Sequence, residues 1–292
     1  MDFGGIITAM VTPFNDDLTV DFEAAANLAS YLVDNGSEGL VITGTTGEST
    51  TLTMDESAEL YKVVMASVGD RAYVIAGSGS NSTAEAIHLT QAAEAAGVHA
   101  SLQVAPYYNK PSQEGFYRHF KSVAANTALP LILYNIPGRT AKNVEPETII
   151  RLSEIDNIVG VKEASGSLDA VTKIVIGSSE GFLVYSGDDS MTLPIVSLGG
   201  RGVISVASHI AGNEMSEMIE AFSGGDHKRA TSLHNKLSGL FRVLFIAPNP
   251  APVKAALNIL GRNVGGVRLP LVEATDDEKV KITAVLKDLG IA

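Results

Sequence analysis

Short apolar runs alternate with amphipathic stretches along most of the chain. Eight of the runs are apolar almost throughout, which is typical of strands that are buried on both faces. They read GIITAMVT, GLVITGT, AYVIAGS, ASLQVAP, PLILYNI, IVGVKEA, FLVYSGD and GVISVAS. Between them, apolar residues recur at helical spacing. The pattern therefore predicts eight strands with helices between them.

Helix boundaries are marked by capping residues and glycines. The first helix is predicted from Phe22 onward, with Gly36 as its stop signal. Residues 53–56 (TMDE) and 82–85 (STAE) each have the spacing of a capping box. In such a box the first hydroxyl and the last carboxylate each accept a backbone N–H from the other residue. Both sequences are therefore expected to open helices.

The alternation of strands and helices predicts parallel pairing, because parallel neighbours need a crossover connection. A closed barrel removes both sheet edges, whereas an open doubly wound sheet would carry a glycine-rich phosphate loop after its first strand. The first run ends in TPF at 12–14, which is no such loop. We predict a TIM (β/α)8 barrel over residues 1–224. A C-terminal helical extension, residues 225–292, is expected to pack on the barrel, with breaks at Asn-Pro 249–250 and Ala-Pro 251–252.

Composition narrows the class of protein. The length of 292 residues suits one barrel domain, and the net charge of −12 argues against a nucleic-acid or anionic-membrane partner. Cysteine is absent, which excludes zinc sites built on thiolates, and the six histidines form no H-x-x-x-H or H-E-x-x-H pair. The start of the chain looks like a strand rather than a signal peptide, and no run is long enough to span a membrane. A soluble, cytoplasmic protein is predicted.

Lys162 lies inside the sixth apolar run, where a charged ammonium is costly without a partner. Side chains alternate along a strand, so Lys162 and Glu163 point to opposite sides. If Lys162 faces the barrel interior, desolvation favours its neutral amine, which can form an imine with a ketone. A lysine that reaches solvent or pairs with a carboxylate is the open alternative.

Other strand ends carry polar groups, where a barrel places its active site. Tyr134, one strand before Lys162, is a candidate proton donor and acceptor, or a core tyrosine. The turn at 44–47 (GTTG) offers backbone N–H groups and two hydroxyls to a small carboxylate, or serves only as a turn. Arg139 suits a second carboxylate, or is a solvated loop arginine.

Two adjacent pairs are less specific. Of Tyr107 and Tyr108, one is expected to pack while the other presents its hydroxyl, and the sequence does not decide which. Asp188 and Asp189 have no spaced His, Asp or Glu partners, so we favour a hydrogen-bonding or structural role over metal binding.

Nine motifs follow one another along nearly the whole chain: AMVTPF, GTTGES, PYYNKPSQEG, YNIPGRT, GVKEASG, SGDD, GVISV, NPAPVKAAL and RLPL. In this order they closely resemble the dihydrodipicolinate synthase family, within the class I aldolases that include N-acetylneuraminate lyase. The resemblance implies a Schiff-base condensation of pyruvate with L-aspartate-4-semialdehyde, in diaminopimelate and lysine biosynthesis. No metal or organic cofactor is implied.

The resemblance also implies roles for individual residues. Lys162 would form the Schiff base, with Tyr134 as general acid and base. Thr45 would link Tyr134 to Tyr108, which in the family comes from a neighbouring subunit of a homotetramer (a dimer of dimers). The implied substrate-binding residues are Thr46 and its backbone N–H for pyruvate, Arg139 for the semialdehyde carboxylate, and Gly187 and Ile204, which line the site.

A regulatory lysine pocket is implied at the tight-dimer interface. The residues that match it are Ser49, Asn81, Glu85 and Tyr107. Met54 and Ser57 depart from the pattern, since sensitive bacterial members often carry histidines there. Feedback inhibition by lysine is therefore left open.

Two alternative functions remain. One is a lyase of the same family that cleaves a sugar-derived 2-keto acid, as N-acetylneuraminate lyase does. The other is a barrel that binds carboxylates without turnover. Arg139 favours the synthase, because the lyase branch lacks that arginine.

Overall fold

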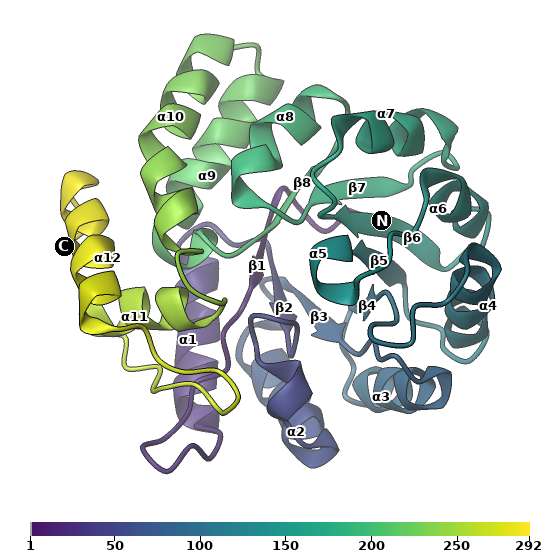
Figure 1. The fold of residues 1–292 in the computed structure, drawn as a ribbon, viewed down its shortest axis with the longest axis horizontal. Coiled ribbons are helices and arrows are strands. Elements are labelled where there is room, and N and C mark those ends of the chain that lie inside the picture. The colour runs from purple at the N-terminus through teal and green to yellow at the C-terminus, as the bar shows by residue number, and fades with distance from the viewer. Residues whose placement is uncertain (1) are drawn as a thin grey trace.

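The computed structural model describes residues 2–292, and its eight strands close into a barrel of parallel neighbours (Figure 1). The strands are β1 (Ile6–Ala9), β2 (Gly39–Ile42), β3 (Tyr73–Gly77), β4 (Ala100–Val104), β5 (Leu131–Asn135), β6 (Ile158–Glu163), β7 (Leu183–Ser186) and β8 (Gly202–Ser205). Each of the eight predicted runs forms a strand in the predicted order. The barrel prediction is confirmed.

Helices surround the barrel. After the strands in turn come α1 (Phe22–Asp34), α2 (Met54–Val68), α3 (Thr83–Ala95), α4 (Gln113–Ala124), α5 (Pro137–Thr140), α6 (Pro146–Leu152), α7 (Leu168–Gly177), α8 (Thr192–Ser197) and α9 (Ser208–Ser223). The chain ends with α10 (His227–Val243), α11 (Ala251–Ile259) and α12 (Asp276–Asp288). Two short 3-10 turns, η1 (Ser49–Thr51) and η2 (Asp189–Met191), precede α2 and α8.

One of the two predicted capping boxes is complete. Thr53 accepts the N–H of Glu56 (3.1 Å), and the Glu56 carboxylate accepts the N–H of Thr53 (2.8 Å). At α3 the prediction is half wrong, because Ser82 accepts the N–H of Glu85 (3.4 Å) without the return bond. The Glu85 carboxylate instead accepts the hydroxyl of Ser80 (2.6 Å), which replaces the backbone donor that the box would use.

Alternation along the strands creates two apolar layers. Ile132 and Tyr134 of β5 belong to the cluster inside the barrel, which also contains Tyr185 and Ile204. Leu133, between the two β5 residues, packs outward against the surrounding helices. Residues that are paired across parallel strands share a face. The interior is therefore filled by side chains, and a polar group that enters it is desolvated.

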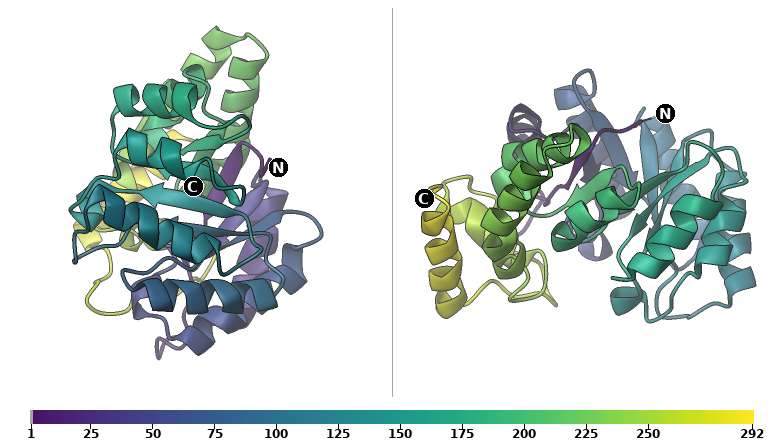
Figure 2. Two further views of the ribbon diagram at one scale, coloured as in Figure 1. Left: turned by 90° about the vertical axis from the view of Figure 1, so that its right-hand side faces the viewer. Right: turned by 90° about the horizontal axis from the view of Figure 1, so that it is seen from above.

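The C-terminal helices gather on one side of the barrel. In Figure 1 and the right view of Figure 2, α12 lies at the outer edge of the molecule. Asn249-Pro250 lies between α10 and α11 as predicted, but the predicted break at Ala251-Pro252 is wrong. Pro252 lies in the first turn of α11, where its missing N–H would have had no helical partner anyway.

The predicted domain boundary at residues 224 and 225 falls in the turn between α9 and α10 and stays a prediction. Among the described residues, no helix has the length and apolar character needed to cross a membrane.

Candidate active site

Lys162 lies inside the barrel. It pairs in register with Tyr134 on one side and Tyr185 on the other, and both tyrosines belong to the interior cluster. Its side chain is buried, with the residue only 6% exposed, and Nζ lies 4.5 Å from the centroid of the Tyr134 ring. Within residues 2–292, no hydrogen bond or ion pair involves this amine. The alternative of a solvent-exposed or paired lysine is therefore wrong.

The surroundings of Lys162 favour a neutral amine. Burial lowers its pKa to about 8, the negative charge of Asp189 opposes this shift, and the positive charge of Arg139 adds to it. Glu163 points the other way, as predicted, and its carboxylate accepts hydrogen bonds from the Asn135 amide (2.9 Å) and the Ser165 N–H (2.7 Å). A neutral amine is the form that attacks a ketone.

Gly187 provides the space in which the Lys162 side chain lies. A Cβ at this position would lie 2.6 Å from Cβ of Ala164 and 3.1 Å from Cε of Lys162. The Cβ of Ala164 is fixed to its backbone, so a side chain at position 187 would require the backbone to move, and the Lys162 side chain would have to shift as well. The glycine after β7 thus allows the lysine to extend past the end of its own strand.

Tyr134 and Thr45 lie next to this amine. Burial raises the pKa of Tyr134 to about 12, which keeps its hydroxyl protonated, while the charge of Arg139 and a side-chain interaction with Thr45 act in the opposite direction. Thr45 follows β2 and is partly buried. The structure thus brings three of the four predicted catalytic residues together, which suits a proton relay between a hydroxyl pair and an amine.

Thr46, the second threonine of the same turn, is hydrogen-bonded to a residue from the C-terminal part of the chain. Thr46 is 3% exposed, and its Oγ1 accepts a hydrogen bond from Nδ2 of Asn249 (2.9 Å). Because Oγ1 already accepts a hydrogen bond, the hydroxyl proton is free to be donated elsewhere. Sequence reasoning gave Asn249 no role, although the residue stands in an Asn-Pro step interpreted as a helix break and begins the NPAPVKAAL motif.

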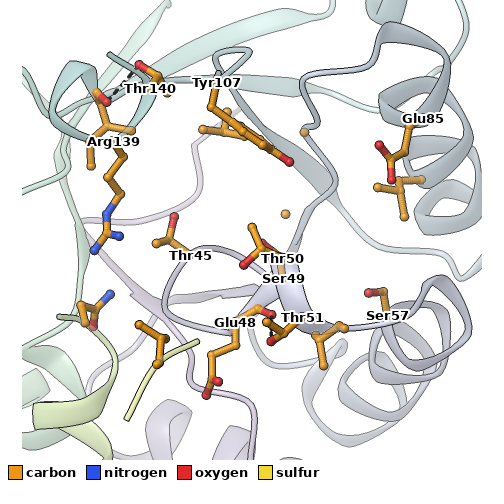
Figure 3. Close-up of a pocket in the computed structure, with 18 of the residues that line it drawn as sticks. Thr45, Glu48, Ser49, Thr50, Thr51, Ser57, Glu85, Tyr107, Arg139 and Thr140 are labelled. Carbon is orange, nitrogen blue, oxygen red and sulfur yellow. Dashed lines mark hydrogen bonds between the residues drawn. The ribbon is translucent and has the colours of Figure 1, made fainter. Parts of the chain in front are cut away.

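Arg139 extends from α5 into a cavity of about 560 Å³ at the carboxyl ends of the strands (Figure 3). Within the described chain its guanidinium has no ion-pair partner, so it is available to an anionic ligand. Thr45, Ile136 and Asn249 line the same cavity, whereas Lys162 and Tyr134 lie deeper in the barrel. Thr45 and Arg139 therefore line the cavity and also interact with the buried pair, Thr45 with Tyr134 and Arg139 with both Tyr134 and Lys162.

Tyr108 does not join this group within one chain. It is 89% exposed and has a φ of +69°, a left-handed conformation that is uncommon for an aromatic residue. Tyr107 lines the cavity, which answers the question that the sequence left open. Tyr108 therefore presents its ring to the outside of the subunit.

Ile204 and Asp189, two further candidates, are both buried. Ile204 is buried in the interior cluster with Tyr134. Asp189 accepts hydrogen bonds from the Ser205 hydroxyl (2.5 Å) and the Ala207 N–H (2.9 Å), as expected of a structural role. Among residues 2–292, no group of three His, Cys, Asp or Glu side chains is arranged to hold a metal.

The chain matches known proteins over its full length. The sequence model of the dihydrodipicolinate synthetase family covers residues 2–289. The chain belongs to this family. A relative from Moorella thermoacetica, named 4-hydroxy-tetrahydrodipicolinate synthase, is 56% identical over 291 residues, which is 100% of both chains.

Solved members of the dihydrodipicolinate synthetase family have the same fold. The dihydrodipicolinate synthase from Bacillus anthracis has a TM-score of 0.97 and 50% identity, with 98% of each chain covered. The enzyme from Cyanidioschyzon merolae, which has lysine bound, has a TM-score of 0.98 and 47% identity, with 99% of each chain covered. These full-length matches favour the synthase over both alternative functions.

Among the candidate lysine-site residues, Glu85 lies at the other end of the cavity from Arg139. Figure 3 shows Arg139 and Thr45 on one side and Glu85 on the other, with Ser49 between them. Tyr107 also lines the cavity. Asn81 is not among the lining residues, and its carbonyl accepts a hydrogen bond from the Asn109 amide (2.8 Å).

Proposed function

We propose that Lys162 forms an imine with pyruvate and that Tyr134 and Thr45 move the protons. The activity of the chain is that of 4-hydroxy-tetrahydrodipicolinate synthase, a class I aldolase-type lyase of diaminopimelate and lysine biosynthesis. It condenses pyruvate with L-aspartate-4-semialdehyde. The observation that supports Lys162 is its buried amine, which has no ion-pair partner among the described residues and a pKa lowered to about 8.

The first half of the reaction activates pyruvate. The neutral amine of Lys162 adds to the ketone carbon, and loss of the carbonyl oxygen as water leaves a protonated imine. Removal of a methyl proton then gives an enamine, because the imine accepts the electron pair. Tyr134 lies beside the amine, so it can supply the proton for the departing water and later accept one.

The second half joins the substrates. The enamine carbon attacks the aldehyde carbon, and the aldehyde oxygen takes a proton to become the 4-hydroxyl group. The amino group of the semialdehyde then adds to the imine carbon and displaces Lys162, which closes the ring. One water molecule leaves overall, and the lysine is returned free.

Two carboxylates need binding positions. Thr46 and its backbone N–H suit the pyruvate carboxylate, since Asn249 leaves the threonine hydroxyl proton free. Arg139 suits the carboxylate of the semialdehyde, because its guanidinium enters the cavity without an ion-pair partner in the described chain. Gly187 and Ile204 complete the wall around the reacting carbons.

The assembly is proposed to be a homotetramer, built as a dimer of dimers. Tyr108 supports the pairing of two copies within it, because its exposed ring and left-handed backbone suit insertion into the active site of a neighbouring copy. There it would extend the proton relay from Thr45. A cytoplasmic location is proposed because the family to which the chain belongs carries out a biosynthetic reaction.

A lysine-binding site is proposed in the part of the cavity that extends from its middle to the end away from Arg139. Ser49, Glu85 and Tyr107 line it, and the Glu85 carboxylate could pair with an ammonium group. Met54 and Ser57 also line the cavity and supply no imidazole. Asn81 contributes only if its loop turns inward. We therefore propose weak inhibition by lysine.

The experiment is a steady-state assay with pyruvate and L-aspartate-4-semialdehyde, with and without added lysine. We expect turnover only when both substrates are present, and little inhibition at lysine concentrations below the millimolar range. Turnover of a sugar-derived 2-keto acid, with none of the semialdehyde, would contradict the assignment. Arg139→Met is the matched variant, because it should weaken semialdehyde binding while pyruvate still forms the adduct on Lys162.

A further inference from the structure

The turn that carries Thr45 and Thr46 is contacted by a segment from the other end of the chain. We call residues 44–47 the threonine turn and residues 249–268 the C-terminal segment. Asn249 donates to Thr46, which lies 203 positions earlier in the sequence. Lys254 and Arg268 of the same segment both contact Glu48, the residue that follows the threonine turn.

The backbone conformation of Glu48 connects the threonine turn to the 3-10 turn that follows it. Its φ is +57°, a left-handed conformation that is strained for a residue with a Cβ. Its N–H donates to the Thr45 carbonyl (3.1 Å), and its own carbonyl accepts the N–H of Thr51 (3.0 Å). The backbone of Glu48 therefore links the candidate substrate-binding hydroxyls to η1.

The Glu48 side chain is held by a buried ion pair. Nζ of Lys254 lies 2.8 Å from Oε1 of Glu48, and both side chains are almost fully buried. The same Nζ donates to the Gly266 carbonyl (2.6 Å) and lies 4.0 Å from the centroid of the Phe14 ring. Apolar residues often stabilise a protein as well as a buried ion pair does. An ion pair at this place is therefore better explained by the geometry it fixes.

Arg268 extends the network to the next two elements. Its backbone N–H donates to Oε2 of Glu48 (2.9 Å), so one carboxylate oxygen is hydrogen-bonded and the other, Oε1, has the ion pair with Lys254 but no hydrogen bond. Its guanidinium donates to the Thr51 carbonyl (2.8 Å) and to both oxygens of Glu56 in the first turn of α2 (2.9 and 2.6 Å). The threonine turn, η1 and α2 are thus fixed relative to the C-terminal segment.

We propose that Glu48 and Lys254 are positioning residues for the condensation. Their ion pair holds the threonine turn in the conformation that receives the pyruvate carboxylate. Figure 3 shows the Glu48 side chain directed away from Thr45, so it acts through the backbone and not on the substrate. The inference rests on the proposed role of Thr45 and Thr46 in the reaction. It assigns the C-terminal extension a part in substrate affinity.

The test uses Glu48→Gln, Lys254→Met and the double variant, each as the full chain. In both single variants KM for pyruvate should rise at least about tenfold, because the threonine turn is no longer fixed. KM for the semialdehyde should change less than about threefold, since Arg139 keeps its surroundings. The value of kcat should fall as well, because Thr45 of the same turn belongs to the proposed proton relay. In the double variant no buried charge lacks a partner, so Tm should recover while KM for pyruvate stays high.

Arg201→Met is the matched control. Arg201 pairs with Asp2 (2.8 Å) before β8 and β1, at the end of the barrel opposite the site, so its loss should lower Tm without changing KM for pyruvate. The positioning role is overturned if KM for pyruvate stays within about twofold of wild type in Glu48→Gln, or returns to wild type together with Tm in the double variant. Glu48→Gln and the double variant decide the matter if Lys254→Met does not fold.

Reductive trapping of pyruvate separates this inference from the proposed function. Wild-type protein that gives no adduct on Lys162 contradicts the proposed function itself. A wild-type adduct with unchanged KM values in the variants contradicts only the positioning role of Glu48 and Lys254.

Discussion

Two lysines of this protein are buried to a similar extent, with Lys162 6% exposed and Lys254 2% exposed. Lys254 has a carboxylate at 2.8 Å and a carbonyl at 2.6 Å. Lys162 has an aromatic ring at 4.5 Å and, among residues 2–292, no ion-pair partner. Burial lowers the pKa of both, but the charge of Glu48 adjacent to Lys254 opposes the shift there. The presence or absence of an ion-pair partner, and not the degree of burial, therefore distinguishes the structural Lys254 from the proposed reactive Lys162.

Replacement of each lysine by methionine should give opposite changes in stability. The pKa of Lys162 is lowered from 10.5 to about 8, so folding carries a penalty of roughly 3 kcal/mol at neutral pH, which fades as the pH rises from 8 to 10.5. Lys162→Met removes that penalty and should raise the free energy of unfolding, while kcat/KM falls at least about 10⁴-fold. Lys254→Met should lower the free energy of unfolding by about 3 kcal/mol, because the Glu48 carboxylate loses its partner. Urea unfolding at pH 7 and a steady-state assay measure both, and a loss of stability in Lys162→Met would contradict the comparison.

Removal of the Tyr134 hydroxyl tests the proton relay beside Lys162. Tyr134→Phe should lower kcat by about 10²- to 10³-fold, because the buried hydroxyl no longer supplies and accepts protons during imine formation. Tyr185→Phe is the control, since its hydroxyl donates to the Gly4 carbonyl (3.1 Å) and takes no part in the proposed relay. Equal losses of kcat in the two variants would show that Tyr134 acts only through packing.

The space around Lys162 is tested by a single methyl group. Gly187→Ala should lower kcat/KM by about 10²-fold, because the new Cβ would lie 2.6 Å from Cβ of Ala164 and 3.1 Å from Cε of Lys162, so the local backbone and the amine would both shift. Gly239→Ala adds a Cβ that meets its nearest neighbour at an ordinary 3.7 Å, so its kinetics should match wild type. Rates of reductive trapping with pyruvate report the shift directly, and an unchanged rate in Gly187→Ala would contradict it.

The pH dependence of imine formation tests the lowered pKa of Lys162, and it is the smallest of the expected effects. Below the pKa of Lys162, about 8, the trapping rate should fall roughly tenfold per pH unit, and above it the rate should level off. Arg139→Met removes a positive charge that lowers this pKa, so the midpoint should move to higher pH. Cyanoborohydride trapping between pH 6 and 9 measures both profiles. A midpoint that moves to lower pH in Arg139→Met would oppose this description of the electrostatics.

The barrel and most of the site follow from local patterns in the sequence. Continuous apolar runs predict strands that are buried on both faces, and strand alternation predicts that Lys162 and Glu163 point to opposite sides, as the structure confirms. The structure adds that Lys162 is the one inside the barrel. The position of Gly187 was predicted only from resemblance, and the structure adds its physical reason in the space taken by Lys162. Local sequence patterns are sufficient to predict the direction of a side chain when that direction depends on a single strand.

Contacts between distant segments were not predictable in this way. The pairing of Glu48 with Lys254 and of Thr46 with Asn249 joins residues about 200 positions apart, and no local pattern encodes such a distance. The capping box at Ser82 failed because Ser80, two residues earlier, competes for the Glu85 carboxylate. The position of Tyr108 in an assembled site depends on a second copy of the chain, which one sequence does not describe.

The most direct test maps the lysine that pyruvate modifies. Wild-type protein is incubated with pyruvate, reduced with borohydride, digested and analysed by mass spectrometry. We predict a pyruvyl adduct on Lys162 and none on the equally buried Lys254. An adduct on another lysine, or no adduct at all, would contradict the assignment of Lys162 as the Schiff-base residue.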